Sequence, residues 1–306
     1  MPIKPKIIVI TGPTASGKSA VAIEVAQAIT ADIINADSMA FYKGFDIGSA
    51  KPSNFDRQLV NHHLLDVVAP DSDFTCADFV KLAHPIIRRL YALGRFSLVV
   101  GGTGLYIRSL TKGIFNGPGR DDAYRRYLIE QESAGIDLHK MLTKLDPQSA
   151  MKIKPSDRAR IERALEVLHL TGVGISYHQQ LHKLADRPYD FITIIIDRPA
   201  DELNQIIKTR TERMFKEGLI EETRELLNTG YSPQLKPFKS VGYLEATEFI
   251  AHRLTLQEAI ESTIKRTKQL VKRQRTWLRG QCPGGLWMKP VATKITKVIR
   301  DFLALR

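Results

Sequence analysis

A glycine-rich loop near the N-terminus is the first stretch whose residue types and spacing suit chemistry. The spacing G-x-x-x-x-G-K-[ST] is satisfied by Gly12, Gly17, Lys18 and Ser19. The strand-like run KIIVI precedes the loop and the helical run AVAIEVAQAI follows it, which is the context in which this pattern binds phosphate. The glycines let backbone N–H groups converge on an anion, Lys18 adds a positive charge, and the Ser19 hydroxyl suits Mg²⁺. We therefore predict a phosphate site, and the loop leaves open whether a nucleotide supplies the phosphates.

An acidic residue follows the second predicted strand, ADIINA (31–36). Asp37 comes directly after it, and the carboxyl ends of parallel strands meet at one edge of a sheet, so we expect Asp37 beside the phosphate loop. Most P-loop nucleotide hydrolases instead carry a Mg²⁺-holding aspartate at the end of another strand. Asp37 is thus suited to reaching a substrate, and a turn or helix-cap aspartate in the sequence NADS is the alternative.

A threonine between glycines follows the buried run FSLVV (96–100). This run leads into GGTG without an acidic residue, and Thr103 should open onto the same edge as Asp37. Its hydroxyl is placed to hydrogen-bond a phosphate oxygen or a base. A tight turn explains the glycines equally well.

A row of basic residues near the C-terminus, here called the basic stripe, indicates a negatively charged binding partner. Residues 265–279 include seven basic side chains and no carboxylate. Five of these recur at intervals of three and four and so share one helical face: Lys265, Lys268, Lys272, Arg275 and Arg279. An adjoining face is apolar, with Ile260, Ile264, Val271 and Leu278. Because uncompensated like charges at these spacings repel, the stripe favours contact with nucleic-acid phosphates, and a solvated surface is the alternative.

The elements that must position these residues follow an α/β order. Strand-like and helical runs alternate to about residue 113, including a helix over 75–93. Charged helical segments follow, in one of which Ser156 or Asp157 is the expected cap and Gly172 the expected end, before FITIIID (191–197) is strand-like again. We predict a P-loop NTPase-like parallel sheet flanked by helices, formed by residues 1–114 and 191–306, with a mainly helical insertion domain at 115–190.

Composition limits the class of protein. The 306 residues carry 45 Lys and Arg against 33 Asp and Glu, a net charge of +12, which favours a polyanionic partner such as nucleic acid. Cys76 and Cys282 are far apart in the sequence and form no metal-binding or disulfide pattern. With no signal pattern and no apolar run of membrane-spanning length, we expect a cytoplasmic protein that does not enter a membrane.

Seven stretches together resemble one enzyme family. They lie in order between residue 12 and residue 280 and read GPTASGKS, ADSMAFYKGFDIGSAKP, HHLLDVV, LVVGGTGLYIRSL, RARIERALEV, SVGYLEA and TKQLVKRQRTWLRG. In these features the chain is similar to the bacterial tRNA dimethylallyltransferase family, also called tRNA isopentenyltransferases. The resemblance implies transfer of a dimethylallyl group from dimethylallyl diphosphate to N6 of the adenine immediately 3′ of the anticodon in tRNA.

The resemblance also implies roles for individual residues. Asp37 would orient the amine and accept its proton, and Thr103 would lie near the reacting groups. A Mg²⁺ ion held with Ser19 would assist the departing diphosphate. The residues expected to hold the diphosphate are Gly12, Pro13, Thr14, Ala15, Ser16, Gly17, Lys18, Ser19 and Arg210.

Contacts to the tRNA anticodon stem-loop are implied for several segments. Many family members carry glutamine where this chain has Ala40, so one side-chain contact to the nucleotide is missing or supplied elsewhere. With the basic stripe, the expected tRNA-contacting residues are Asp37, Ser38, Met39, Ala40, Thr103, Arg125, Ala159, Arg160, Ile161, Glu162, Arg163, Lys239, Ser240, Val241, Gly242, Tyr243, Leu244, Lys265, Lys268, Lys272, Arg275 and Arg279.

Two other functions compete with this one. A P-loop kinase acting on a small molecule or nucleoside would bind ATP at the same loop, but it leaves the basic stripe unexplained. A non-catalytic RNA-binding module leaves the intact phosphate loop unexplained. The family suggests a monomer.

Overall fold

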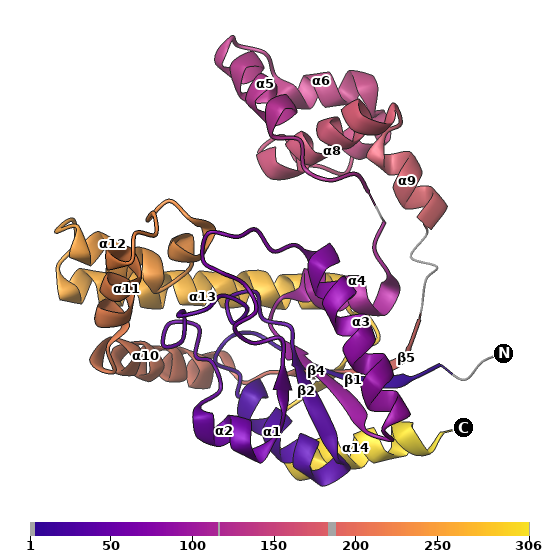
Figure 1. Ribbon diagram of the computed structural model, residues 1–306, viewed down its shortest axis with the longest axis vertical. Helices are drawn as coiled ribbons and strands as arrows, with labels where there is room; N and C mark the ends of the chain where they lie inside the picture. The colour runs from indigo at the N-terminus through magenta and orange to yellow at the C-terminus, as the bar shows by residue number, and fades with distance from the viewer. Residues whose placement is uncertain (1–3, 116, 183–187, 306) are drawn as a thin grey trace. The chain divides into compact units, whose positions relative to one another are not determined.

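The chain forms two compact units. The computed structural model describes residues 4–115, 117–182 and 188–305. Unit 1 comprises Met1–Thr111 and Pro188–Arg306, and unit 2 comprises Lys112–Arg187 (Figure 1). Residue 116 and residues 183–187, which fall in the predicted insertion, lie outside the described residues.

Unit 1 is built on a six-stranded sheet in which every pairing is parallel. The strand order is β3-β2-β4-β1-β5-β6. The strands are β1 (Lys6–Thr11), β2 (Ala31–Asn35), β3 (His62–His63), β4 (Phe96–Gly101), β5 (Asp190–Ile196) and β6 (Leu286–Met288). This arrangement confirms the predicted fold class of a parallel α/β sheet flanked by helices.

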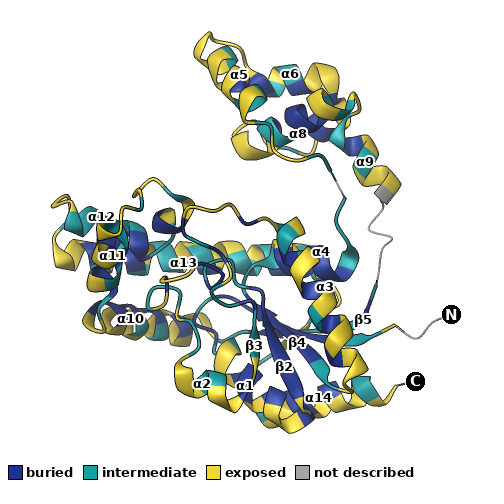
Figure 2. Ribbon diagram, viewed as in Figure 1, coloured by how far each residue is buried: buried dark blue, intermediate teal, exposed yellow. Residues whose placement is uncertain are grey.

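Both faces of the sheet are buried because its strands are apolar on both sides. On one face Ile8 and Ile10 pack with α1 (Lys18–Ile29) and with Ile295 of α14 (Ala292–Ala304). On the other face Ile7 and Val9 belong to the cluster that contains the buried residues of α3 (Cys76–Ala92) and α4 (Gly104–Lys112). Figure 2 shows the strands as the buried centre of the unit.

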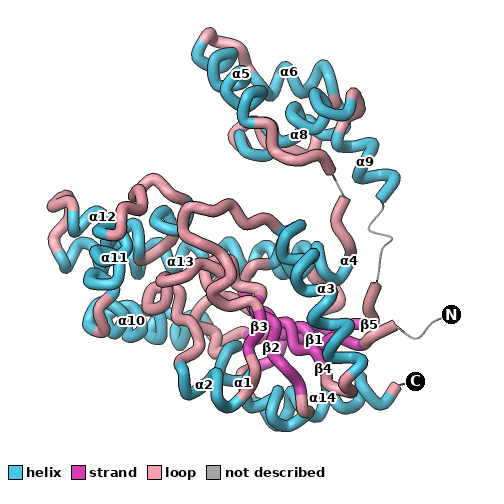
Figure 3. Tube along the Cα trace, viewed as in Figure 1, coloured by secondary structure: helices cyan, strands magenta, loops and turns pink. Residues whose placement is uncertain are grey.

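Further helices extend this second core. They are α10 (Ala200–Lys216), α11 (Leu219–Asn228), α12 (Tyr243–Ile250) and α13 (Leu256–Gln281), with the 3₁₀ helix η1 (Lys236–Lys239), while α2 (Asn54–Leu59) follows β2 (Figure 3). The long helix α13 packs against both α10 and α12. Among the described residues, no helix combines the length and apolar content needed to cross a bilayer.

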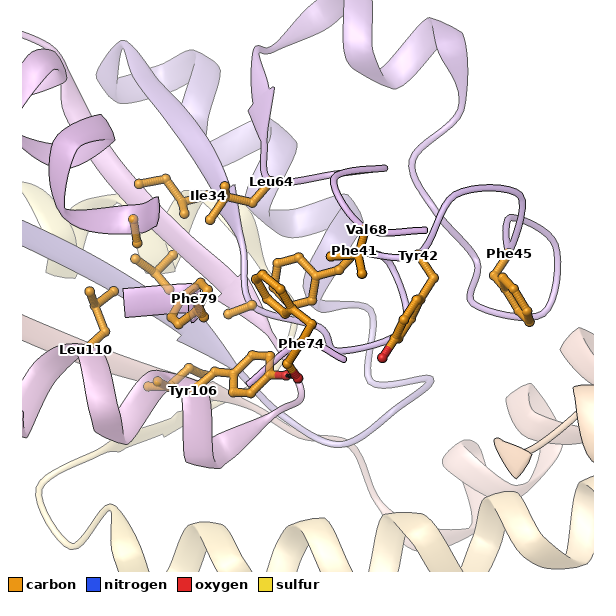
Figure 4. Packing of buried hydrophobic residues seen from close by; sticks show 14 of the residues in the cluster. Ile34, Phe41, Tyr42, Phe45, Leu64, Val68, Phe74, Phe79, Tyr106 and Leu110 are labelled. Carbon is orange, nitrogen blue, oxygen red and sulfur yellow. Dashed lines mark hydrogen bonds between the residues drawn. The ribbon is translucent and has the colours of Figure 1, made fainter. Parts of the chain in front are cut away.

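An aromatic cluster fixes the segment that follows β2. The ring centroids of Phe41 and Phe74 are 4.5 Å apart, and Tyr106 of α4 stacks on Phe79 of α3 at 5.3 Å (Figure 4). Phe41 is fully buried and comes four residues after Asp37. The chain that carries Asp37 is therefore held between β2 and this cluster rather than forming a free loop.

Unit 2 is helical, with its own small core. Its helices are α5 (Asp122–Ser133), α6 (Leu138–Leu145), α7 (Pro147–Ala150), α8 (Arg158–Thr171) and α9 (Ile175–His182). Leu128, Leu142 and Leu165 are fully buried in its core. The Asp157 side chain caps α8 by accepting from the Arg160 N–H, and Gly172 ends the helix in a left-handed conformation, as the sequence predicts.

Candidate active site at the carboxyl ends of the strands

The phosphate loop lies between the end of β1 and the start of α1. A Cβ added to Gly12 would lie 2.2 Å from the carbonyl oxygen of Ile196, so only glycine fits there. Gly17 has a left-handed φ of 91° and stands directly before Lys18, the first residue of α1. The two glycines thus let the loop pass close to β5 and turn into the helix, as the pattern predicts.

A buried hydroxyl in this loop is unsatisfied. The Ser16 side chain is fully buried, and its Oγ is the one buried side-chain polar atom that lacks a hydrogen-bond partner within the described residues. Leaving such a group unpaired costs about 1–3 kcal/mol. The loop therefore holds a polar group that a bound ligand can satisfy.

Lys18 lies at the junction of loop and helix. Its Nζ donates to the carbonyl oxygen of Pro13 at 3.5 Å. Burial lowers the pKa of Lys18 to about 8, while the negative charge of Asp37 raises it and the positive charge of Arg210 lowers it. The ammonium is thus poorly solvated, and an anion bound at the loop would stabilise its charged form. Ser19, the next residue, is exposed in the first turn of α1.

Arg210 of α10 reaches the same loop. Its Nη1 donates to Thr14 Oγ1 at 3.4 Å. Burial lowers the pKa of Arg210, and the charge of Asp37 opposes that shift. Because Asp37 acts electrostatically on both Lys18 and Arg210, the structure brings two cations and one carboxylate together at the phosphate loop.

Asp37 and Thr103 lie on two adjoining loops. The Ser38 N–H donates to Thr103 Oγ1 at 2.9 Å, and the Thr103 N–H donates to the carbonyl oxygen of Ala36 at 3.2 Å. Asp37 Oδ1 accepts the Met39 N–H at 3.1 Å, which is the local turn that the sequence left as an alternative. Among the described residues only this oxygen of the carboxylate accepts a hydrogen bond. The turn orients the side chain without using its second oxygen.

Two contacts to the phosphate loop escaped the sequence analysis. Gln274 of α13 accepts the Thr14 N–H at 2.9 Å, and Arg198, after β5, donates from Nε to the carbonyl oxygen of Ser16 at 3.1 Å. For Gln274 a signal was present, because it lies three residues after Val271 and four before Leu278 and so falls on the apolar face of the helix. No local pattern singles out Arg198.

The basic stripe of α13 is less uniform than predicted. Lys265, Lys268, Lys272 and Arg279 are exposed. Arg275, however, forms an ion pair with Asp197 at 2.8 Å and donates to the carbonyl oxygen of Arg198. The expectation that the whole stripe lacks a compensating carboxylate is therefore wrong for Arg275, because its partner comes from a segment 78 residues away in sequence.

The segment Lys239 to Leu244 is only partly accessible. Lys239 is exposed, whereas Gly242 and Tyr243 are buried. The Tyr243 hydroxyl donates to Glu222 Oε1 at 2.6 Å and accepts the Gly48 N–H at 3.1 Å. The structure thus places the Tyr243 side chain in the core of unit 1, and the expected RNA contact of this segment stays a prediction.

In unit 2 two of the predicted RNA-contacting arginines share one buried carboxylate. Glu166 is fully buried and accepts Arg125 Nε at 2.7 Å and Arg163 Nη1 at 2.5 Å. Burial opposes ionisation of Glu166, but hydrogen bonds from Arg125, the Asp121 N–H and Arg163 outweigh it and lower its pKa to about 2. These two arginines organise the unit itself.

The remaining predicted residues of α8 differ in exposure. Ala159 and Arg160 are exposed, and Glu162 is half-buried and pairs with Arg158 at 2.7 Å. Ile161 is buried among the apolar residues of unit 2. A helix that covers a core turns part of any contiguous segment inward, so the expected RNA contact of Ile161 stays a prediction that its buried side chain does not support. In the loop after Asp37, Ser38 and Met39 are half-buried and Ala40 is buried.

Comparison with known proteins identifies the family. The family model for IPP transferase matches residues 40–281, and a model for isopentenyl transferase matches residues 5–67. A tRNA dimethylallyltransferase of Geobacter sulfurreducens is 44% identical over 90% of this chain and 89% of its own length. The Geobacter metallireducens relative of the same name is 45% identical over 90% of each chain.

Solved structures agree with these matches. The tRNA isopentenylpyrophosphate transferase of Bacillus halodurans is 33% identical, with a TM-score of 0.72 over 98% of this chain and 96% of that one. A eukaryotic dimethylallyltransferase captured acting on tRNA is 25% identical, with a TM-score of 0.83 over 98% of this chain and 80% of that one. Given a family model that spans most of its length and relatives that share more than 40% of its residues, the chain belongs to the IPP transferase family.

Proposed function

We propose that this protein transfers a dimethylallyl group from dimethylallyl diphosphate to N6 of the adenine 3′-adjacent to the anticodon of tRNA, with release of diphosphate. The names of its relatives support the reaction. The observation that carries the mechanism is the joint presence of Lys18, Arg210 and Asp37 at the phosphate loop. This combination suits a reaction in which an anion departs while an amine loses a proton.

The phosphate loop stabilises the leaving group. As the allylic C–O bond breaks, negative charge builds on the diphosphate, and Lys18 and Arg210 supply positive charge beside it. Ser16 Oγ, unpaired among the described residues, donates a hydrogen bond to a phosphate oxygen. Donors that are already in place need no reorganisation during the reaction, which is the largest single source of catalysis at many sites.

Mg²⁺ fits this loop through Ser19. The Ser19 hydroxyl stands in the first turn of α1, directly after the loop, and is exposed. Mg²⁺ keeps several waters and is commonly held by one or two protein oxygens together with substrate phosphates, so no larger cluster of protein ligands is needed. When bound, the ion would neutralise charge on the departing diphosphate.

Asp37 acts on the nucleophile, and Thr103 holds the loop that carries Asp37. An exocyclic adenine amine is a weak nucleophile, and Asp37 orients it and accepts its proton as the new C–N bond forms. Thr103, hydrogen-bonded to the backbone next to Asp37, keeps that loop in place. The adenine must leave the base stack of the anticodon loop to reach these residues.

The RNA lies along the exposed cations of α13. Lys265, Lys268, Lys272 and Arg279 are exposed and recur along this helix, an arrangement that suits a phosphate backbone. In unit 2, Arg160 is exposed and available for a second contact with the anticodon stem.

A labelling experiment tests the proposal. The protein is incubated with an anticodon stem-loop RNA and isotope-labelled dimethylallyl diphosphate, and in parallel with ATP. We expect label in the RNA at the adenine 3′ of the anticodon, and no label when that adenine is replaced by guanine. Turnover of ATP without transfer of the isoprenoid would indicate a kinase and overturn the proposal.

A further inference from the structure

Gln274 joins the two loops of the candidate site. Its Oε1 accepts the Thr14 N–H of the phosphate loop at 2.9 Å, and its Nε2 donates to the carbonyl oxygen of Gly102 at 3.3 Å. Gly102 directly precedes Thr103. One side-chain amide on α13 thus uses both of its polar ends, one on each loop.

Side chains of α13 around Gln274 pack closely against the loop that contains Gly102. A Cβ added to Gly102 would lie 2.8 Å from Gln274 Nε2, and one added to Gly104 would lie 2.2 Å from the ring of Trp277. Because Gly102 and Gly104 have no side chains, α13 can pack directly against the loop that contains Thr103. The neighbouring Arg275 binds Asp197 and the carbonyl oxygen of Arg198, so this part of α13 is also tied to the end of β5.

A core role alone does not call for glutamine at this position. Gln274 lies on the apolar face of α13 between Val271 and Leu278, which are buried. An apolar side chain of equal length would pack there without the need to satisfy a half-buried amide. Glutamine differs from such a side chain because its amide carries both a hydrogen-bond acceptor and a hydrogen-bond donor.

Backbone hydrogen bonds connect Gly102, which Gln274 contacts, to the segment that carries Asp37. Thr103, the next residue, accepts the Ser38 N–H and donates its own N–H to Ala36. A shift of Gly102 relative to Thr14 therefore moves the Asp37 segment relative to the phosphate loop. If the diphosphate is held by one loop and the amine by the other, this distance decides how well the reacting atoms meet.

We propose that Gln274 is a positioning residue, which sets the separation of the diphosphate-holding loop and the Asp37 loop for group transfer. The inference rests on the proposed function, because only a reaction between groups held by both loops depends on their separation. Gln274 touches no reacting atom and acts through its hydrogen bonds to Thr14 and Gly102.

The test replaces Gln274→Met, which keeps the length of the side chain and removes both hydrogen bonds. Gln269→Met, at an exposed position of the same helix, is the matched control. Amide exchange by mass spectrometry should become faster in peptides covering residues 12–17 and 101–104 in Gln274→Met alone. kcat for transfer should fall about 10- to 100-fold, while the Kd for RNA stays unchanged and the melting temperature falls by only a few degrees.

A second variant distinguishes loss of loop positioning from a general folding defect. Gln274→Asn is too short to span both loops but keeps the amide, so it should show the same changes in exchange and kcat. Unchanged exchange in both variants, or a kcat within twofold of wild type, would overturn the inference. A wild-type protein that transfers no dimethylallyl group would overturn the proposed function instead, and the exchange comparison would still decide whether Gln274 holds the loops.

Discussion

Side chains of opposite charge meet at one edge of the sheet, and this contrast underlies the proposed chemistry. Lys18 and Arg210 are buried enough for their pKa values to be lowered, while Asp37 acts in the opposite direction on both. The phosphate loop and Asp37 were predictable because each follows a strand directly and parallel strands end together. Arg198 and Glu222 were not, because their contacts join segments far apart in sequence.

Replacing Asp37 separates proton transfer from diphosphate binding. In Asp37→Asn the amide cannot accept a proton, so the rate of transfer under single-turnover conditions should fall about 100-fold or more. The affinity for dimethylallyl diphosphate, measured by calorimetry without RNA, should stay equal or increase, because a negative charge near Lys18 is removed. Asp46→Asn is the control, since Asp46 pairs with Lys51. An Asp37→Asn enzyme as fast as wild type would disprove the base assignment.

The lowered pKa of Lys18 predicts a pH dependence of ligand binding. Free Lys18 loses its proton near pH 8, and a bound diphosphate raises that pKa by favouring the charged form. Above pH 8, binding of dimethylallyl diphosphate should therefore take up a proton, and affinity should decrease as the pH rises further. Calorimetry in buffers of different ionisation enthalpy measures the proton, and Lys18→Met should abolish its uptake. Binding at about pH 9 with no proton uptake would contradict the assignment.

At the scale of elements, helix ends and strands that carry a strong local pattern were predictable. The expected helix over 75–93 is observed as Cys76–Ala92, and FITIIID is observed as the strand Asp190–Ile196. The strands β3 and β6 have only two and three residues, so their existence depends on pairing rather than on local sequence. For the same reason the pattern of α13 showed its basic face but not the Asp197 partner of Arg275.

Two basic residues of α13 should behave differently when replaced. Lys272 is exposed, so Lys272→Ala should weaken RNA binding and reduce the slope of log K against log salt by about 0.7–0.9. Arg275→Ala removes the charged hydrogen bonds to Asp197 and should lower the free energy of unfolding by about 1–3 kcal/mol, with a smaller change in salt slope. Filter binding at several salt concentrations and chemical denaturation measure the two effects. Equal salt slopes for wild type and Lys272→Ala would show that Lys272 of α13 does not contact the RNA phosphates.

The carboxylate between α5 and α8 predicts how unit 2 responds to acid. The folded-state pKa of Glu166 is about 2, below the ordinary value of 4.5. Its contribution to stability is therefore complete above about pH 4.5 and decreases as the pH falls toward 2. Glu166→Gln should destabilise unit 2 by about 3 kcal/mol at neutral pH and flatten this acid dependence, as measured by amide exchange of residues 121–171. Wild-type exchange in the variant would show that the pairing is dispensable.

At the scale of the whole molecule, a parallel sheet places every candidate catalytic group of unit 1 at one edge. β1, β2 and β4 lie side by side in the sheet, so the phosphate loop, Asp37 and Thr103 follow neighbouring strands. Unit 2 has a separate core and a separate ion-pair cluster. Topology, rather than any single motif, explains how residues 12–19, 37 and 103 come to lie at the same edge of the sheet.

In the proposed mechanism one loop holds the diphosphate while Asp37 receives the amine beside it. A crystal structure with an unreactive thiolo analogue of dimethylallyl diphosphate and an anticodon stem-loop RNA would locate both groups. We expect phosphate oxygens within hydrogen-bond distance of Ser16 Oγ and Lys18 Nζ, and the adenine N6 within that distance of the Asp37 carboxylate. A diphosphate bound away from residues 12–19, or an adenine N6 out of reach of Asp37, would disprove this mechanism.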